Sequence, residues 1–167
     1  MSDRVVSPRL RLAVSGCLFV ACLGFLLHLV VQTQSLVVLS RSQFLVANLF
    51  VAAEIVDDQG KPGEKIVVAK VYWAVDPADE KLAGGEIRVL NLPDARASTG
   101  YAGTGKYLLP IYKRVAKTGE VDYLVPPVPM VPGYTPPEDG PDVRVYPLTP
   151  QVEAQLAELV AQRKKER

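Results

Sequence analysis

FLVANLFVAAEIV, residues Phe44–Val56, is followed after a polar turn by KIVVAKVYWAV, residues Lys65–Val75. Both segments are rich in Val, Ile and aromatic residues, which favour β-strands. The turn between them, DDQGKPG, carries Gly and Pro, which typically interrupt regular structure. We interpret its Asp pair as part of the turn, because too few oxygens are in register for a calcium site. The sequence therefore predicts a β-hairpin, and this hairpin decides the fold class.

Alternation along the hairpin assigns its side chains to two faces, because successive strand residues point to opposite sides of a sheet. In the first strand Leu49, Val51, Ala53 and Ile55 share one face. In the second strand one face carries Val67, Ala69, Val71, Trp73 and Val75, and the other carries Ile66, Val68, Lys70 and Tyr72. We therefore expect Trp73 inside the fold and its neighbour Tyr72 on the opposite face.

Three more short strands are predicted after the hairpin, separated by turn-type loops. They are EIRVLNL (Glu86–Leu92), KYLLPIYK (Lys106–Lys113) and VDYLV (Val121–Val125). Five short antiparallel strands need closure or a cover to hide their edges, so we expect a small five-stranded barrel of the OB type. Pro110 lacks an N–H group and is expected at an edge or bulge position of its strand.

The barrel segments resemble those of the netrin-like family, which includes the tissue inhibitors of metalloproteases. The shared motifs are FLVANLFVAAEIVDD, KIVVAKVYW and a glycine-rich loop leading to GKYLLPIYK, over about Phe44–Val125. The resemblance implies a five-stranded OB-type barrel. Inhibitors of that family chelate the enzyme's zinc with an N-terminal Cys and hold the barrel edge with disulfides. This chain has neither feature, so the resemblance implies a fold without the inhibitory activity.

The loop GYAGTGKY, Gly100–Tyr107, matches seven of the eight positions of a phosphate-binding P-loop. A P-loop requires a helix after the loop and a Ser or Thr after the Lys. Here Tyr107 follows Lys106, and Pro110 is incompatible with a helix at that place. We therefore interpret this stretch as a flexible loop that enters a strand, and we expect no nucleotide there.

LAVSGCLFVACLGFLLHLVV, residues Leu12–Val31, contains no charged residue. As a helix it is long enough to cross a hydrocarbon core of about 30 Å. Arg4, Arg9 and Arg11 precede it, and the first charge after it is Arg41. The positive-inside rule therefore places the N-terminus in the cytoplasm and the rest of the chain outside it.

We expect this apolar segment to be an uncleaved signal anchor, because it is longer than a typical signal peptide and has no Ala-x-Ala exit. The alternatives are a cleaved signal peptide and a lipoprotein modified at Cys17 or Cys22. Small residues on one face allow membrane helices to approach closely, so they are a candidate interface with a second copy or a partner. This face comprises Ala13, Gly16, Cys17, Val20, Ala21 and Gly24. Ordinary use of Gly and Ala in membrane helices explains the face equally well.

PPVPMVPGYTPPEDGP, Pro126–Pro141, is predicted to run in polyproline II conformation as a strap along the barrel. Its P-x-x-P spacing would also suit an SH3 domain, but the predicted topology places it outside the cytoplasm. A C-terminal helix is expected from Pro150, with Thr149 as its N-cap. Its apolar stripe packs on the barrel or forms a partner surface, and consists of Val152, Leu156, Leu159 and Val160.

The chain offers few groups for catalysis. Outside the predicted anchor it contains no His and no Cys, and its carboxylates lie mostly in turns. We therefore assign no catalytic, cofactor-binding or metal-binding residue. Trp73, Tyr72 and Lys70 would suit a nucleic-acid face of an OB barrel. However, the net charge of +1 and the predicted location argue against nucleic acid as a partner.

The sequence predicts a mainly β protein in six parts: a cytoplasmic N-terminus (1–11), a transmembrane signal anchor (12–31), a linker (32–43), an OB-like barrel (44–125), a proline-rich strap (126–148) and a C-terminal amphipathic helix with a basic tail (149–167). The expected function is non-enzymatic binding or scaffolding by a single-pass membrane protein. Its expected partners are the lipid bilayer, another envelope or membrane protein, and a second copy through the membrane helix. The alternatives are an accessory subunit of a membrane complex and a carboxylate-based enzyme.

Overall fold

The computed structural model describes residues 8–33, 37–59, 61–115, 119–130, 132–135, 138 and 140–165. The chain divides into two compact units, residues 1–36 and residues 37–167, which we describe one at a time. Parts of five predicted regions lie outside the described residues. They are residues 1–7 of the N-terminus, 34–36 of the linker, 60 and 116–118 of the barrel, 131, 136, 137 and 139 of the strap, and 166–167 of the basic tail.

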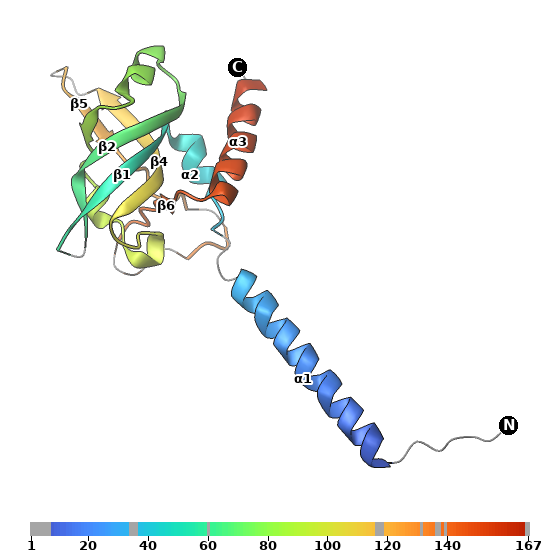
Figure 1. Ribbon diagram of the computed structural model, residues 1–167. Helices are drawn as coiled ribbons and strands as arrows, with labels where there is room; N and C mark the ends of the chain where they lie inside the picture. The colour runs from blue at the N-terminus through green and yellow to red at the C-terminus, as the bar shows by residue number, and fades with distance from the viewer. Residues whose placement is uncertain are drawn as a thin grey trace. The chain divides into compact units, whose positions relative to one another are not determined.

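The first unit contains helix α1 (Pro8–Thr33), shown in Figure 1. The side chains that the structure describes in it, from Val14 to Leu29, are exposed. Within the described part of the chain, no helix has both the length and the apolar character needed to cross a membrane. The transmembrane assignment of residues 12–31 therefore stays a prediction from the sequence.

The second unit is a nearly closed, five-stranded antiparallel barrel with a C-terminal helix (Figure 1). Strand β1 pairs with β2 on one edge and with β4 on the other, β3 extends the sheet beyond β2, and β5 extends it beyond β4. A parallel bridge between Val89 and Tyr123 brings the β3 side to β5. The strands are β1 (Leu49–Asp58), β2 (Lys61–Ala74), β3 (Glu86–Arg88), β4 (Gly105–Val115) and β5 (Val121–Leu124).

The five predicted strands are confirmed, but the first begins later than expected. Residues 41–46 form a short helix, α2 (Arg41–Val46), where the sequence predicted strand from Phe44. Asn48 sets the boundary, because its side chain bonds both the N–H (2.7 Å) and the carbonyl (3.1 Å) of Lys113 in β4. The predicted third strand is shorter than expected and ends at Arg88, and η2 (Leu92–Asp94) follows it.

Pro110 lies in β4 where the outer edge of that strand passes from one partner to another. Tyr107 and Leu108 pair with the short strand β6 (Tyr146–Pro147), and the residues from Tyr112 onward pair with β5. A residue without an N–H group is tolerated in such a gap between two ladders.

One face of β1, which the alternation groups together, fills the barrel interior. Leu49, Val51, Ala53 and Ile55 are fully buried in it. They pack with buried residues from the other strands and from the segment before β6, among them Ile66, Val68, Ile87, Val89, Leu92, Leu109, Ile111, Val125, Val143 and Val145. Burial of these side chains removes apolar surface from water, which is the main driving force for folding.

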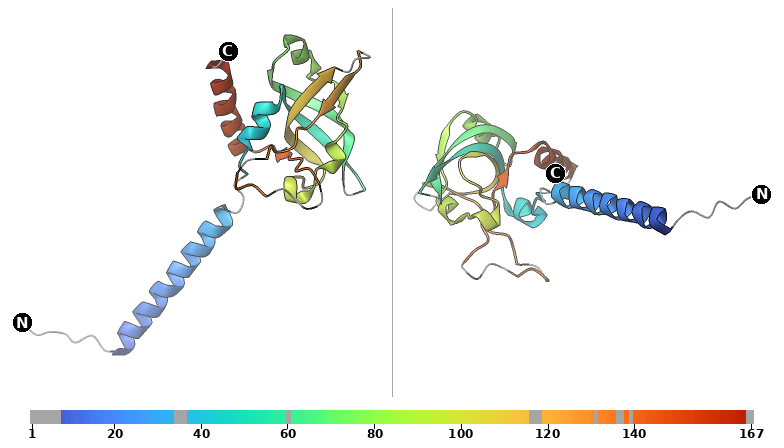
Figure 2. Two further views of the ribbon diagram at one scale, coloured as in Figure 1. Left: turned by 180° about the vertical axis from the view of Figure 1, so that it is seen from behind. Right: turned by 60° about the horizontal axis from the view of Figure 1, so that its bottom comes forward.

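A second apolar layer covers the outside of the barrel, where α2 and helix α3 (Pro150–Lys165) lie against it (Figures 1 and 2). Phe50, on the other face of β1, contacts the rings of Phe44 (5.0 Å between centroids) and Trp73 (4.7 Å). We call this set the outer layer: Leu39, Phe44, Ala47, Phe50, Trp73, Leu108, Tyr146, Val152 and Leu156.

Helix α3 begins as the sequence predicted, with Thr149 Oγ1 accepting a hydrogen bond from the N–H of Val152 (3.2 Å). Its apolar stripe packs on the barrel, which is one of the two alternatives left open by the sequence. Val152 and Leu156 are fully buried, and Leu159 and Val160 are partly buried at the margin of the outer layer. The stripe is therefore covered by the barrel of the same chain.

Trp73 is buried as expected, but the prediction that it lies inside the barrel beside Val71 is wrong. Phe50 pairs with Trp73 and Val51 pairs with Val71, so the intervening Tyr72 has no opposite residue. Each such extra residue reverses the facing of the strand, because side chains alternate. Trp73 consequently lies in the outer layer, whereas Val71 packs against the interior.

A second register shift, at Ala69, similarly reverses the predicted faces in the first half of β2. Ile66 and Val68 point into the barrel, and Val67 is 47% exposed. Val75, which was predicted to share the core face, is 46% exposed.

The described part of the proline-rich segment forms a loop at the barrel (Figure 2, right). Pro126 and Asp142 are buried at its two ends, and Val128 N–H bonds the carbonyl of Asp142 (2.9 Å) to close its base. Between them, Met130 is 77% exposed. Val131, Pro136, Pro137 and Asp139 of this segment lie outside the described residues.

Gly100 and Gly103 form a matched pair for testing the packing of the glycine-rich loop. Both have a positive φ, +100° and +102°, but a Cβ on Gly100 would lie 2.1 Å from the carbonyl oxygen of Val145, whereas Gly103 faces open space. We expect Gly103→Ala to cost about 1–2 kcal/mol from its backbone conformation, and Gly100→Ala to cost clearly more. Urea unfolding of the full chain measures both; equal losses would contradict the close approach at Gly100.

The α3 stripe gives a second test. Leu156→Ala should lower the free energy of unfolding by about 2–5 kcal/mol, because it removes a fully buried side chain and leaves a cavity. Leu159→Ala, on the same helix but only partly buried, should cost less than half as much. Thermal and urea unfolding of the two full-length variants distinguish them, and similar losses would show that α3 does not pack as described.

Candidate functional site

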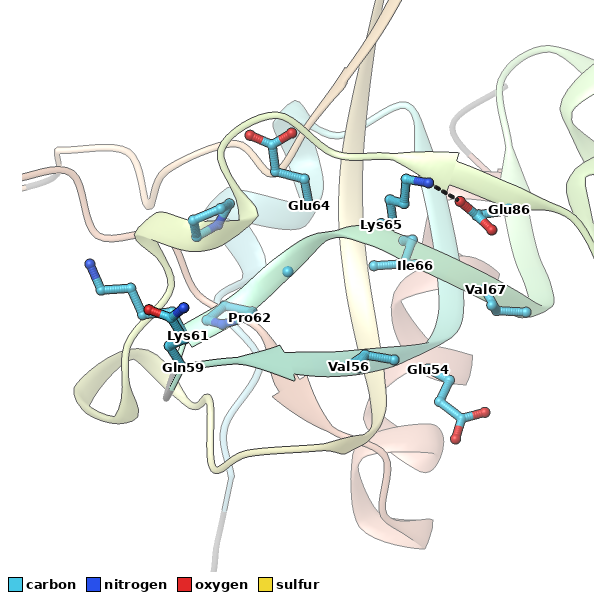
Figure 3. A pocket seen from close by; sticks show the side chains of 12 residues that line it. Glu54, Val56, Gln59, Lys61, Pro62, Glu64, Lys65, Ile66, Val67 and Glu86 are labelled. Atoms are coloured by element: carbon cyan, nitrogen blue, oxygen red, sulfur yellow. Dashed lines mark ion pairs between the residues drawn. The ribbon is translucent and has the colours of Figure 1, made fainter.

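An open groove of about 830 Å³ lies along the β1–β2 hairpin (Figure 3). A large bulge borders it: Ile55 pairs with Ile66 and Asp57 with Pro62, so the single residue Val56 opposes the three residues 63–65. Extra residues on one strand bend it away from its partner and leave part of the ladder unpaired. The bulge therefore separates β2 from β1 locally and shapes the groove.

The floor of the groove is apolar and its rim is charged. Val56 is 59% exposed and Val67 is 47% exposed, and both line the groove. Pro62, Ile66 and Pro93 also contribute to the lining. An apolar floor with a few charged groups around it is typical of a binding cleft.

Most charges on the rim are already paired within the chain. Lys65 Nζ lies 3.2 Å from Glu86 Oε1, and Arg88 Nε donates to Glu64 Oε2 at 2.6 Å. Two other charged residues line the groove, Glu54 and Lys61. Among the side chains that the structure describes, neither has an ion-pair partner. Figure 3 shows Lys61 at one end of the groove and Glu54 at the other.

Sequence reasoning missed this groove because it arises from a bulge. The alternation pattern assigned Ile66 and Val68 to the outward face of β2 and Val67 to the inward face. The exposure of Val67 was therefore not predicted. The one available signal was Pro62-Gly63 at the start of β2, since Pro and Gly inside a strand mark an irregular position.

The glycine-rich loop that matches the P-loop motif is closed on itself. The hydroxyl of Tyr107 accepts a hydrogen bond from Ala102 N–H (3.1 Å) and donates one to the carbonyl of Gly103 (2.6 Å). Strand β4 begins at Gly105, which confirms the expected strand after the loop. Lys106 is exposed. A tyrosine of the chain thus holds the loop together where a P-loop presents its N–H groups to phosphate.

Lys113 forms an ionic cluster that fastens η1 (Pro77–Leu82) to β4. Its Nζ lies 2.6 Å from Oδ1 of the buried Asp79 and 3.4 Å from Oδ2 of Asp76. The hydrogen bond with Asp79 raises the pKa of Lys113 above its usual value, so the ammonium form is retained. These groups satisfy one another, and the cluster has a structural role.

Asp142 is buried at the base of the proline-rich loop. Its Oδ2 accepts hydrogen bonds from Arg144 (2.8 Å from Nε) and from the hydroxyl of Tyr134. Oδ1 has no hydrogen-bond partner among the described residues. The signal in the sequence was the Asp-x-Arg spacing, because residues two apart in an extended segment share a face.

Gln43 connects α2 to two distant segments inside the outer layer. Its Nε2 donates to the carbonyls of Pro126 (2.7 Å) and Arg144 (3.1 Å), and its Oε1 accepts from the hydroxyl of Tyr146 (2.7 Å). That hydroxyl also accepts from Ser40 N–H (3.1 Å). Burial raises the pKa of Tyr146 to about 12. This network holds the entry of the barrel, the base of the loop and β6 together.

The candidate interface on α1 is exposed over the part of the helix whose side chains are described. Gly16, Cys17, Val20, Ala21 and Gly24 are exposed, and Cys17 and Cys22 are free thiols. The side chain of Ala13 lies outside the described set. A role of this face in association stays a prediction. Within the described residues, no group of three or more His, Cys, Asp or Glu side chains could hold a metal ion.

Comparison of the chain with protein-family models, with curated proteins and with solved structures finds no match. The resemblance to netrin-like domains therefore rests on the sequence motifs alone and stays a prediction. The function has to be argued from the groove and from the polar groups around the barrel.

We expect the buried Tyr146 hydroxyl to make the stability of the protein depend on pH in the alkaline range. The pKa of Tyr146 is raised from 10 to about 12 in the folded state, so its contribution to stability is complete below pH 10 and is lost as the pH rises toward 12. Two units correspond to a loss on the order of 2–3 kcal/mol. Urea unfolding between pH 9 and 12 measures the slope. Tyr146→Phe should be less stable at pH 8, but its free energy of unfolding should fall less steeply as the pH rises. An unchanged dependence on pH would contradict the raised pKa of Tyr146.

Proposed function

We propose that the chain is a non-enzymatic, membrane-anchored binding protein whose barrel holds a partner outside the cytoplasm. The observation that carries this proposal is the groove on the β1–β2 hairpin, where the exposed Val56 and Val67 are accompanied by two charges that lack ion-pair partners among the described residues. Exposed apolar surface rimmed by polar groups marks interaction sites in many proteins.

The strand arrangement supports an OB-like barrel. Neighbouring strands run in the order β1-β2-β3-β5-β4 and back to β1, with a parallel contact between the β3 side and β5. OB folds are five-stranded, partly open barrels that bind ligands on the face of their second and third strands and on the loop between the first and second. The groove is lined by β1, β2 and β3 and by Gln59 in that loop, so it lies in the corresponding region.

The polar clusters support a binding role over an enzymatic one. The three clusters described above, around Lys113, Asp142 and Gln43, all bond segments of the chain to one another. None of their residues lines the groove. Catalytic carboxylates would be expected to converge on one point of a cleft, whereas two of the three carboxylates that line the groove, Glu64 and Glu86, are engaged by Arg88 and Lys65.

The proposed anchor is supported by the sequence of the N-terminal segment. Residues 12–31 contain no charged side chain, and three Arg residues precede them. The apolar side chains that the structure describes in α1 are exposed within their unit, as expected of a segment that meets lipid. An accessory subunit of a membrane complex would use the same features.

Site-specific photo-crosslinking of the full chain in its native membranes tests the proposal. A photoreactive residue in place of Val67 should give a discrete adduct with one membrane or envelope protein, and the chain should stay in the pellet after alkaline carbonate treatment. The matched control is the same residue in place of Val115, which is 63% exposed on β4 outside the groove. Release of the chain by carbonate, or equal adducts from both positions, would contradict the proposal.

A further inference from the structure

We infer that the groove takes an extended polypeptide segment of a partner that carries one basic and one acidic side chain four residues apart. This inference rests on the proposed binding function and names the class of partner. It follows from where Glu54 and Lys61, which lack ion-pair partners among the described side chains, lie on the β1–β2 ladder.

The register fixes the spacing of the two charges along the sheet. Lys61 pairs with Asp58, and Glu54 lies four residues before Asp58 on β1. A strand rises about 3.3 Å per residue, so the two positions are about 13 Å apart along β1. The separation is an even number of residues, and directly opposite residues share a face, so both positions belong to one side of the sheet.

An extended partner has the same rise per residue as β1. Its side chains four residues apart are therefore spaced like Glu54 and Lys61, and they can meet both at once: the base at Glu54 and the acid at Lys61. The residue midway between them then lies over Val56, which is two residues from each position on β1. Val67, which pairs with Glu54, borders the same apolar floor, so we expect an apolar residue in the middle.

The remaining charges favour a peptide over an anionic polymer. Glu54, Glu64 and Glu86 all line the groove, and a phosphate backbone would approach three carboxylates. Arg88 and Lys65 are already engaged by Glu64 and Glu86. A segment with one charge of each sign neutralises Glu54 and Lys61, which lack ion-pair partners among the described side chains, and leaves the existing pairs intact.

The test uses the full chain in mild detergent and a fluorescently labelled peptide, Ser-Glu-Thr-Val-Thr-Lys-Ser, whose Kd is measured by anisotropy. Glu54→Lys should weaken binding by about two- to fivefold, which is the range for an exposed ion pair. Glu158→Lys, the same change at an exposed position on α3, should leave the Kd unchanged. A peptide with the same composition but with Glu next to Lys should bind more weakly to the unmodified chain.

Charge compensation provides a readout that loss of folding cannot imitate. A peptide with Lys in place of its Glu should bind the unmodified chain poorly and bind the Lys61→Glu variant about two- to fivefold more tightly. The inference is overturned if the first peptide does not bind, if spacing has no effect, or if Glu54→Lys and Glu158→Lys behave alike. In those cases a Val67 crosslink to a partner would still support the proposed function. If neither the peptide binding nor the Val67 crosslink is observed, the inference and the proposed function are both overturned.

Discussion

The burial of strand β1 on both faces is the constraint on which the rest of the second unit depends. One face supplies Leu49, Val51, Ala53 and Ile55 to the barrel interior, and Phe50 on the other face lies at the centre of the outer layer. Both edges of β1 are also paired, with β2 and with β4. A strand in this position has almost no polar side chain, which explains the continuous apolar run at the start of the barrel. The outer face of β1 is covered by the outer layer up to Glu54, and from Glu54 onward it is exposed to solvent.

This change from covered to exposed surface divides the outside of the barrel into two regions. Near the start of β1 the chain covers the sheet itself: α3 packs on Phe50 and Trp73, and Arg163 bonds the carbonyls of Phe44 and Leu45 at the end of α2. Near the end of β1 no element of the outer layer covers Val56 and Val67. The bulges in β2 make the change possible, because each one resets which side chains face outward. A groove with an apolar floor remains where the outer layer stops.

The strands, the division of the β1 side chains between two faces and the start of α3 could be predicted from the sequence because each depends on local pattern: alternation, turn residues and a Thr-Pro cap. The faces of β2 could not, since the extra residues at Ala69 and Tyr72 are visible only when β2 is aligned with β1. Helix α2 was missed because Phe44 and Leu45 have strand-like neighbours, and the bonds of Gln43 that favour the helix reach residues about 80 to 100 positions away. The groove was missed for the same reason as the faces of β2.

Amide hydrogen exchange of the full chain tests this account most directly. If β1 is buried on both faces and paired on both edges, the amides of Leu49–Ile55 should exchange only through global unfolding and should be the slowest in the second unit. The bulge residues 63–65, beside the open groove, should exchange faster than Ile66–Val68 on the same strand. Comparable exchange of β1 and the bulge would contradict the central claim, because β1 would then not be the fixed element against which the groove is formed.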